Sequence, residues 1–215
     1  MATGLHRDII KFDERAKRTQ YIKRTFSQYF GKSVLDVGCD RAVLKGMLDA
    51  GCDYTGIDIG GTPDIQVNLE QIDRLPFDDG AFDCIICSDV LEHLDNLHHV
   101  FLELLRVSRG RVIIGWPNNW VVARRPIERG RGSFAHYGLP VDKPADRHKW
   151  FFSYTQAREF VHAHASRDGL DVLEERICEK PRNKLVFALR HMRYPKADLY
   201  YNRYSHTYWS VLGMK

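Results

Sequence analysis

The chain has 215 residues, of which 44% are hydrophobic and 28% are charged. This balance excludes a largely disordered, collagen-like or coiled-coil chain, and the length suits one α/β domain. The net charge of +4 is too small to indicate nucleic acid as a partner by itself. No apolar run approaches the roughly 18 residues that cross a bilayer, and residues 1–24 lack the apolar stretch of a secretory signal. We therefore expect one domain, over residues 1–215, that works in the cytoplasm.

The cysteine count agrees with a reducing compartment. Five cysteines cannot all pair within one chain, so we expect reduced thiols. Cys84 and Cys87 lie three positions apart in an apolar run that reads as a strand, where such residues point to opposite faces. We therefore expect two buried thiols there, and neither a shared metal nor a disulfide.

The first half of the chain alternates between strand and helix patterns. Amphipathic spacing predicts a helical cap over residues 1–32, ahead of a core over 33–192. The expected elements that follow are a strand at 33–37, a helix at 43–50, a strand at 54–58 and an apolar stretch at 65–69. Strand and helix alternation indicates a parallel sheet with crossover helices. Because only residues 59–64 separate the last two segments, we expect this connection to lack a helix and the third strand to be short or irregular.

The second half continues the pattern and then changes. We expect strands at 82–88 and 111–116, helices at 97–108 and 154–165, and a long loop at 118–152 that holds the substrate. Two further runs, 171–178 and 184–191, flank a turn signal and are expected to form an antiparallel hairpin. The remaining segment, 193–215, holds several tyrosines and a tryptophan, so we expect an aromatic tail that packs against another surface and offers a contact for a homo-oligomer.

Residues that follow the strands deserve the closest attention, because ligands of open α/β sheets bind at the carboxyl ends of strands. Asp36 and Gly38 end the first strand, and glycine lets a backbone approach a ligand closely. Asp58 ends the second strand, about 20 residues further on, where an acidic residue can bind a ribose hydroxyl. Ser88 and Asp89 end the strand at 82–88.

These segments resemble the class I S-adenosylmethionine-dependent methyltransferases, in the small methyltransferase-domain family (type 11-like) that includes ubiquinone-type O-methyltransferases. The resemblance is carried by VLDVGC (34–39), YTGIDI (54–59), LPFDDGAFDCIICSDVLEHL (75–94) and LLRVSRGRVIIGWPN (104–118). It implies a doubly wound, mostly parallel seven-stranded sheet of order 3-2-1-4-5-7-6 with an antiparallel C-terminal hairpin. It also implies S-adenosylmethionine as cofactor, with S-adenosylhomocysteine as product, and a cofactor site formed by Asp36, Gly38, Cys39, Asp58, Ile59, Leu69, Glu70, Ser88 and Asp89.

One position departs from the family pattern. The family usually carries Gly-x-Gly where this chain has Gly38-Cys39-Asp40, and another small residue, commonly glycine, where it has Ala42. Asp tolerates a positive φ better than most residues, so the turn can survive. The added carboxylate would repel the carboxylate of the cofactor unless Arg41 or another basic neighbour offsets its charge.

Methyl transfer to a hydroxyl requires a base for the acceptor proton, and histidine suits this task near neutral pH. The candidate bases are His93, His136 and His148, each of which also has an ordinary structural interpretation. This scheme requires no metal. The sequence thus predicts transfer of a methyl group to a hydroxyl of a small-molecule or glycan-type acceptor.

Two alternatives remain open. Basic residues at 15–24 and 124–131 would suit a nucleic-acid-directed methyltransferase, although no base-flipping motif of the N-P-P-Y type is present, so nucleic acid is the less favoured partner. A non-catalytic, methyltransferase-like interaction protein would use the aromatic segment 194–209 to dock another subunit. The acceptor and the methylated atom are not determined by sequence.

Overall fold

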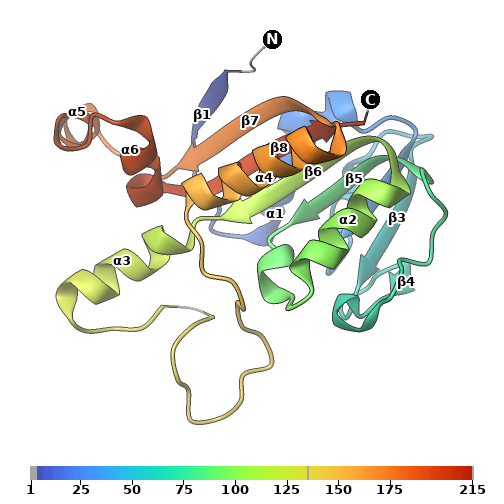
Figure 1. Cartoon of the computed structure of the whole chain (residues 1–215), viewed down its shortest axis with the longest axis horizontal. Helices are drawn as coiled ribbons and strands as arrows, with labels where there is room; N and C mark the ends of the chain where they lie inside the picture. The colour runs from blue at the N-terminus through green and yellow to red at the C-terminus, as the bar shows by residue number, and fades with distance from the viewer. Residues whose placement is uncertain (1–3, 135, 215) are drawn as a thin grey trace.

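The computed structural model describes residues 4–134 and 136–214, which form one mixed β-sheet with helices on both faces (Figure 1). Residues 1–3, 135 and 215 of the segments discussed above lie outside this description. The strands are β1 (Leu5–Ile9), β2 (Ser33–Val37), β3 (Asp53–Asp58), β4 (Ile65–Gln66), β5 (Phe82–Ser88), β6 (Ser108–Pro117), β7 (Asp171–Glu179) and β8 (Ser205–Gly213). The α-helices are α1 (Arg15–Phe26), α2 (Leu97–Val107), α3 (Asn119–Arg129), α4 (Tyr154–Asp168), α5 (Lys184–Arg193) and α6 (Ala197–Tyr204).

The strand order is β1-β7-β8-β6-β5-β2-β3-β4. Seven of these strands follow the predicted order 3-2-1-4-5-7-6, with β4 as the third strand and β8 as the seventh, so the predicted fold class is confirmed. The strand β8 runs antiparallel to both of its neighbours, whereas the other pairs are parallel. The strand β1 is an addition, which pairs with the edge of β7.

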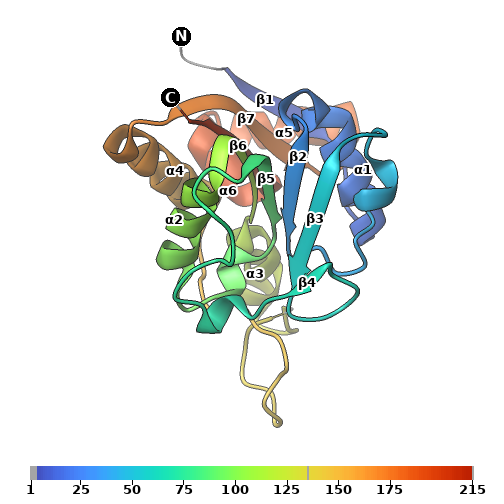
Figure 2. The same ribbon diagram turned by 90° about the vertical axis from the view of Figure 1, so that its right-hand side faces the viewer.

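Two apolar cores flank the sheet because the central strands are buried on both faces. Helices α2 and α4 cover one core, and α1 covers the other (Figure 2). Cys84 belongs to the α1 side and Cys87 to the α2 side, which confirms that their thiols point to opposite faces. All five cysteines are free. No helix within the described residues is long and apolar enough to cross a membrane.

The connection between β3 and β4, the second and third strands of the predicted order, is as short as predicted. Six residues join β3 to β4 without a helix, and β4 has two residues. The prediction of an α-helix at 43–50 is wrong, because this segment forms turns and a short 3-10 helix at Lys45–Met47. Gly46 lies in the middle of the segment, and glycine weakens a helix interior.

The expected hairpin is corrected by the structure. Residues 184–193 form the helix α5, which the Asn183 side chain caps by accepting a hydrogen bond of 2.8 Å from the Val186 N–H. The antiparallel partner of β7 is instead β8, which lies between β6 and β7. The expected C-terminal tail is therefore part of the sheet. Tyr208 and Trp209 are fully buried within the chain, so these residues are not available to dock another subunit.

Two further expectations change. The N-terminal segment contains the strand β1 as well as a helix, because residues 5–9 extend the sheet instead of continuing α1. The segment 118–152 begins with the helix α3, and irregular chain follows it (Figure 1). The sheet thus draws strands from both ends of the chain, beyond the core boundaries of 33–192.

Asp83 joins three segments at the end of the sheet opposite the candidate site. Its carboxylate accepts hydrogen bonds from the backbone N–H groups of Lys32 (2.8 Å) and Ser33 (3.0 Å) and from Nε of Arg109 (2.7 Å). These interactions, with the Arg109 hydrogen bond first, lower the pKa of Asp83 to about 2, while burial opposes the shift. The folded state therefore favours the ionised carboxylate.

We expect Asp83→Asn to lower the free energy of unfolding by about 2 kcal/mol at neutral pH, the size of a charge-assisted hydrogen bond. Because the folded pKa lies below the unfolded one, the stabilisation exists above about pH 4 and disappears as the pH falls toward 2. Urea unfolding over this pH range measures the difference between the variant and the wild type. The exposed Asp78 supplies the control, Asp78→Asn, and a difference that stays constant down to pH 2 would contradict the assignment.

Candidate active site

Two adjoining cavities lie at the carboxyl ends of β2, β3 and β5, and both are lined by Gly38 and Arg15. The larger cavity has a volume of about 490 Å³, which is in the range of small-molecule and cofactor sites. All nine residues predicted to bind a cofactor line these cavities. The smaller one is lined by Asp36, Gly38, Cys39 and Ser88, and the larger one by Gly38, Asp58, Ile59, Leu69, Glu70 and Asp89.

The turn after β2 depends on left-handed backbone conformations. Gly38 has a φ of 77°, and a Cβ at this position would lie 2.3 Å from Cγ2 of Val90. Asp40 and Ala42 both have a φ of 49°, so they keep the left-handed geometry for which glycine is the usual residue. The departure from the family pattern thus preserves the path of the backbone.

The charge of Asp40 is offset by a residue of α1. Arg15, which lines both cavities, places Nε 3.6 Å from Oδ2 of Asp40. The predicted residue for offsetting this charge was Arg41 or another basic neighbour, and that neighbour is Arg15. Arg18, one helical turn further on, forms an ion pair with Asp89. Both arginines belong to the basic cluster at 15–24, but its periodicity alone did not indicate that they face the site.

A non-glycine residue in the left-handed region costs stability, which predicts the effect of Ala42→Gly. We expect this substitution to raise the free energy of unfolding by about 0.5–1 kcal/mol, because it removes the steric cost at a φ of 49°. Chemical denaturation measures the change. Ala50 does not have a positive φ, so Ala50→Gly is the control and is expected to have no stabilising effect. Equal stabilisation by both variants would contradict the prediction.

Asp58 and Asp36 are the two carboxylates at the ends of adjacent strands. Asp58 accepts hydrogen bonds from the N–H groups of Asp40 (2.8 Å) and Gly60 (3.2 Å), which fix its orientation. A carboxylate has about four acceptor positions, so two remain for a ligand. Burial raises the pKa of Asp36 to about 6, and a hydrogen bond of 2.9 Å from the Tyr54 hydroxyl opposes the shift.

Other groups along the cavities are ordered differently. Glu70 accepts a hydrogen bond of 3.0 Å from the Asp95 N–H and pairs with Lys149. Burial raises the pKa of the Cys39 thiol to about 11, so the thiol stays protonated. The buried Ser88 hydroxyl and one oxygen of Asp89 have no hydrogen-bond partner among the described residues. Unsatisfied buried polar groups such as these are free to bind a ligand in the cavity.

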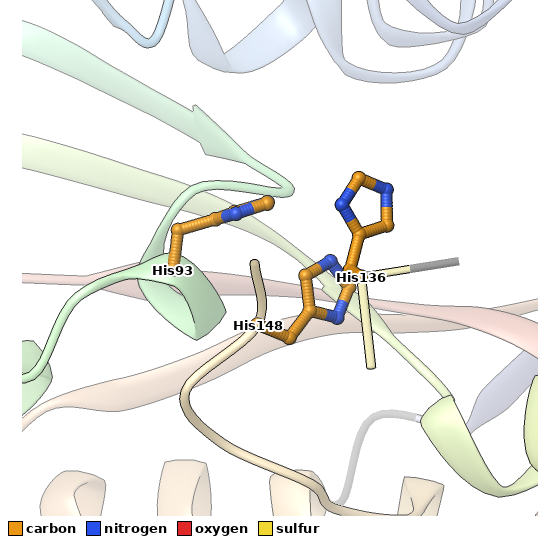
Figure 3. Close-up of side chains that lie close together, drawn as sticks. All are labelled: His93, His136 and His148. Carbon is orange, nitrogen blue, oxygen red and sulfur yellow. The ribbon is translucent and has the colours of Figure 1, made fainter. Parts of the chain in front are cut away.

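The three candidate histidines lie together, although they are far apart in the sequence (Figure 3). The ring centroids of His93 and His148 are 4.5 Å apart, and the rings of His136 and His148 are stacked at the same distance. Asp146 bridges the other two, with a carboxylate oxygen 2.6 Å from Nδ1 of His93 and the second 3.3 Å from Nδ1 of His136. We call the side chains of His93, His136 and His148 the imidazole cluster. His93 and Asp146 also line the larger cavity.

Burial makes His148 a weak base. Burial lowers its pKa to about 4, and the nearby His93 and His136 add to this effect, while Asp146 opposes it. Its Nδ1 lies 3.0 Å from the Asn119 amide nitrogen and 3.2 Å from the Tyr137 hydroxyl. His148 is therefore neutral at physiological pH and held in a fixed orientation.

Glu92 lies under the imidazole cluster and is 1% exposed. Its Oε1 is 3.7 Å from Nε2 of His93 and 4.0 Å from Nε2 of His148, and neither carboxylate oxygen has a hydrogen-bond partner among the described residues. Burial raises its pKa well above the usual range, and the charge of Asp89 adds to this shift. Glu92 was not among the residues predicted from the sequence, although Glu92 precedes His93 directly in the VLEHL segment.

Backbone and side-chain hydrogen bonds fasten the segment that carries His148 to the segment that carries Glu92. The Glu92 carbonyl accepts from the N–H of Lys149 (2.8 Å), and the Leu94 carbonyl accepts from Nε1 of Trp150 (2.7 Å). The His136 carbonyl accepts from the His148 N–H (3.1 Å). The imidazole cluster is thus held by ordered chain on both sides.

An open, mostly parallel α/β sheet with a cavity at the strand ends and an acidic residue after the second strand defines a nucleotide-cofactor enzyme of the doubly wound class. A family model described as a methyltransferase domain matches residues 12–175, more than half of the chain. The chain therefore belongs to the methyltransferase domain family, as its sequence motifs predicted.

Known proteins agree with this family. A ubiquinone biosynthesis O-methyltransferase of Shewanella pealeana is 32% identical over 94 residues, 37% of this chain and 40% of that enzyme. The enzyme of the same name from Sodalis glossinidius is 30% identical over 153 residues, 58% of this chain and 61% of that enzyme. The matches thus span less than two thirds of either relative.

A solved structure confirms the fold. The SAM dependent methyltransferase of Archaeoglobus fulgidus has a TM-score of 0.55 and 15% identity to this chain, and the similarity covers 94% of this chain and 95% of that one. The architecture described above is thus the one found in S-adenosylmethionine-dependent methyltransferases.

Proposed function

We propose that the protein is an S-adenosylmethionine-dependent methyltransferase that transfers a methyl group to a hydroxyl of a small-molecule or glycan-type acceptor. The observation that carries the proposal is the convergence of all nine predicted cofactor residues on two adjoining cavities, with the imidazole cluster beside the larger one. The ubiquinone biosynthesis O-methyltransferases support the choice of a hydroxyl acceptor, since their name states transfer to oxygen.

The cavities fit the chemical groups of S-adenosylmethionine. Asp58 offers an oriented carboxylate for a ribose diol, and a charge-assisted hydrogen bond of this kind is strong. Gly38 presents only its backbone to both cavities, beside the acidic Asp36, where the methionine part would lie. Leu69 supplies an apolar contact and Glu70 a polar one for the adenine. The cofactor would supply an electrophilic methyl group at this site.

The protein contributes alignment and proton removal. An acceptor in the larger cavity lies beside the imidazole cluster, which is where its hydroxyl would lose a proton before attack on the methyl group. His93 is in the best position, because it lines the cavity and its Nδ1 is held by Asp146. The low pKa of His148 makes it a poor base near neutral pH.

The proposal is tested by incubating the protein with S-adenosylmethionine and separate panels of phenols, sugars and RNA oligonucleotides, and by measuring S-adenosylhomocysteine. We expect product with at least one hydroxyl-bearing small molecule or sugar, and none with Asp58→Ala at limiting cofactor. Product with RNA alone, inhibited steeply by salt, would instead establish the nucleic-acid alternative. Cofactor binding without product in any panel would support the non-catalytic alternative.

The structure offers little to favour a nucleic-acid partner. Basic residues of α1 pair with acidic side chains, as in Arg18 with Asp89 and Lys23 with Asp49, so part of the positive charge of this helix is compensated within the chain. Five free cysteines, four of them buried, support activity in a reducing compartment, and we propose the cytoplasm as its location.

A further inference from the structure

We propose that the imidazole cluster, together with Glu92, binds a divalent transition-metal ion of the zinc class. His93, His136 and His148 each offer one ring nitrogen, and these nitrogens all lie within 4.8 Å of one another (Figure 3). Three imidazoles that converge from separate segments form a donor set typical of protein sites for such ions. A metal at these residues differs from the scheme expected from the sequence, in which they are alternative bases and no metal is required.

The buried carboxylate of Glu92 is independent support for a cation at this site. A carboxylate that is 1% exposed and lacks hydrogen-bond partners carries a large desolvation cost unless a cation compensates it. No Lys or Arg side chain pairs with it among the described residues. Its Oε1 instead faces Nε2 of both His93 and His148, at 3.7 and 4.0 Å. A metal ion among these atoms would compensate the carboxylate and bind the imidazoles.

The surroundings of the imidazole cluster also suit a metal. Imidazole ligands usually donate their second ring N–H to a carboxylate or another oxygen, which fixes the ring and the tautomer. Asp146 lies within 3.3 Å of Nδ1 of both His93 and His136, and the Tyr137 hydroxyl oxygen lies 3.2 Å from Nδ1 of His148. His93 and His136 thus have a carboxylate oxygen beside Nδ1, which leaves their Nε2 for the metal, whereas Nδ1 of His148 also lies 3.0 Å from the Asn119 amide nitrogen.

The donor types select the class of ion. Imidazole suits Zn²⁺ and similar transition metals, whereas Mg²⁺ and Ca²⁺ prefer sets of oxygen ligands. We therefore expect binding of Zn²⁺ and no comparable binding of Mg²⁺.

The role of the ion rests on the function proposed above. A metal next to the larger cavity would bind the acceptor hydroxyl as a Lewis acid and lower its pKa. His93 would then be a metal ligand and not the base, so the hydroxyl would release its proton to Asp146 or to solvent. Its oxygen would then form a bond to the methyl carbon, while the carbon–sulfur bond breaks and leaves its electron pair on sulfur, as S-adenosylhomocysteine.

Calorimetric titration of the metal-stripped full chain with Zn²⁺ alone tests the site. We expect one Zn²⁺ per chain, no binding by His93→Ala or His148→Ala, and a loss of about 10- to 100-fold in affinity for Asp146→Asn. His136→Ala is a further variant, in irregular chain at a half-exposed position, so its folding is not at risk. The control is His6→Ala, at an exposed position of β1, which should bind as the wild type does.

Two results would overturn the proposal: no Zn²⁺ binding by folded wild-type protein, or equal loss in His6→Ala and the cluster variants. Thermal unfolding of each apo variant excludes loss of fold as the cause. Asp58→Ala separates this proposal from the proposed function, because it should keep Zn²⁺ binding and lose cofactor binding. A protein that binds Zn²⁺ but never S-adenosylmethionine would retain the metal site and refute the methyltransferase function.

Discussion

Replacement of Asp58 by alanine should weaken S-adenosylhomocysteine binding by about 10- to 100-fold. The carboxylate is fixed by the N–H groups of Asp40 and Gly60 at the mouth of the larger cavity. A hydrogen bond to a charged group is worth about 1.5–3 kcal/mol, and each 1.4 kcal/mol corresponds to a factor of ten in affinity. Loss of the carboxylate removes the acceptors for both ribose hydroxyls.

Thermal unfolding in the presence and absence of S-adenosylhomocysteine measures this effect, because a ligand that binds the folded state raises its stability. The control is Asp53→Ala, at the exposed opposite end of the same strand, outside the lining of both candidate-site cavities. We expect the control to keep the stabilisation by ligand and the Asp58 variant to lose most of it. Equal stabilisation of both variants would show that the ribose binds elsewhere.

Replacement of Trp209 by alanine should lower the free energy of unfolding by about 3–5 kcal/mol, the range for large aromatic side chains in cores. Trp209 is fully buried in β8, with ring centroids 5.8 Å from Tyr21 and 5.5 Å from Phe26 of α1. Its ring also fills the space above Gly115 in β6, where a Cβ would lie 2.8 Å from it. The side chain therefore joins α1 to the centre of the sheet.

Urea denaturation measures this loss. Trp120→Ala is the matched control, since Trp120 is 44% exposed on α3 and its removal should cost far less.

Deletion of residues 193–215 should prevent folding, because it removes the strand between β6 and β7. A folded deletion variant with altered oligomeric mass would instead restore the idea of a docking tail.

The sequence predicted the central strands because their apolar runs are nearly continuous, as doubly covered strands require. It assigned the final strand wrongly because residues 184–191 and 205–213 are both rich in apolar side chains. Asn183, a helix-capping residue, favoured the helix at 184–193, and the run Tyr208–Leu212 fits a buried strand. Tertiary packing distinguishes the two segments, since β8 is buried on both faces whereas the helix α5 has no buried residues.

The position of the nine predicted residues along the two cavities was predictable because each follows a strand or short connection whose position the motifs define. The imidazole cluster was only partly predictable. His93, His136 and His148 were selected one at a time, and nothing in their spacing places them together. Their approach depends on the hydrogen bonds that Lys149 N–H donates to the Glu92 carbonyl and Trp150 Nε1 to the Leu94 carbonyl, which no local pattern reveals.

The most direct test of the central claim is calorimetric titration of the purified wild-type protein with S-adenosylmethionine and, separately, with S-adenosylhomocysteine. We predict micromolar binding of both, about −8 kcal/mol, with one ligand per chain. This result would show that Asp40 and Ala42, in their left-handed conformations, leave the cofactor site open. Absence of binding by folded protein would contradict the methyltransferase function and point to a non-catalytic member of the family.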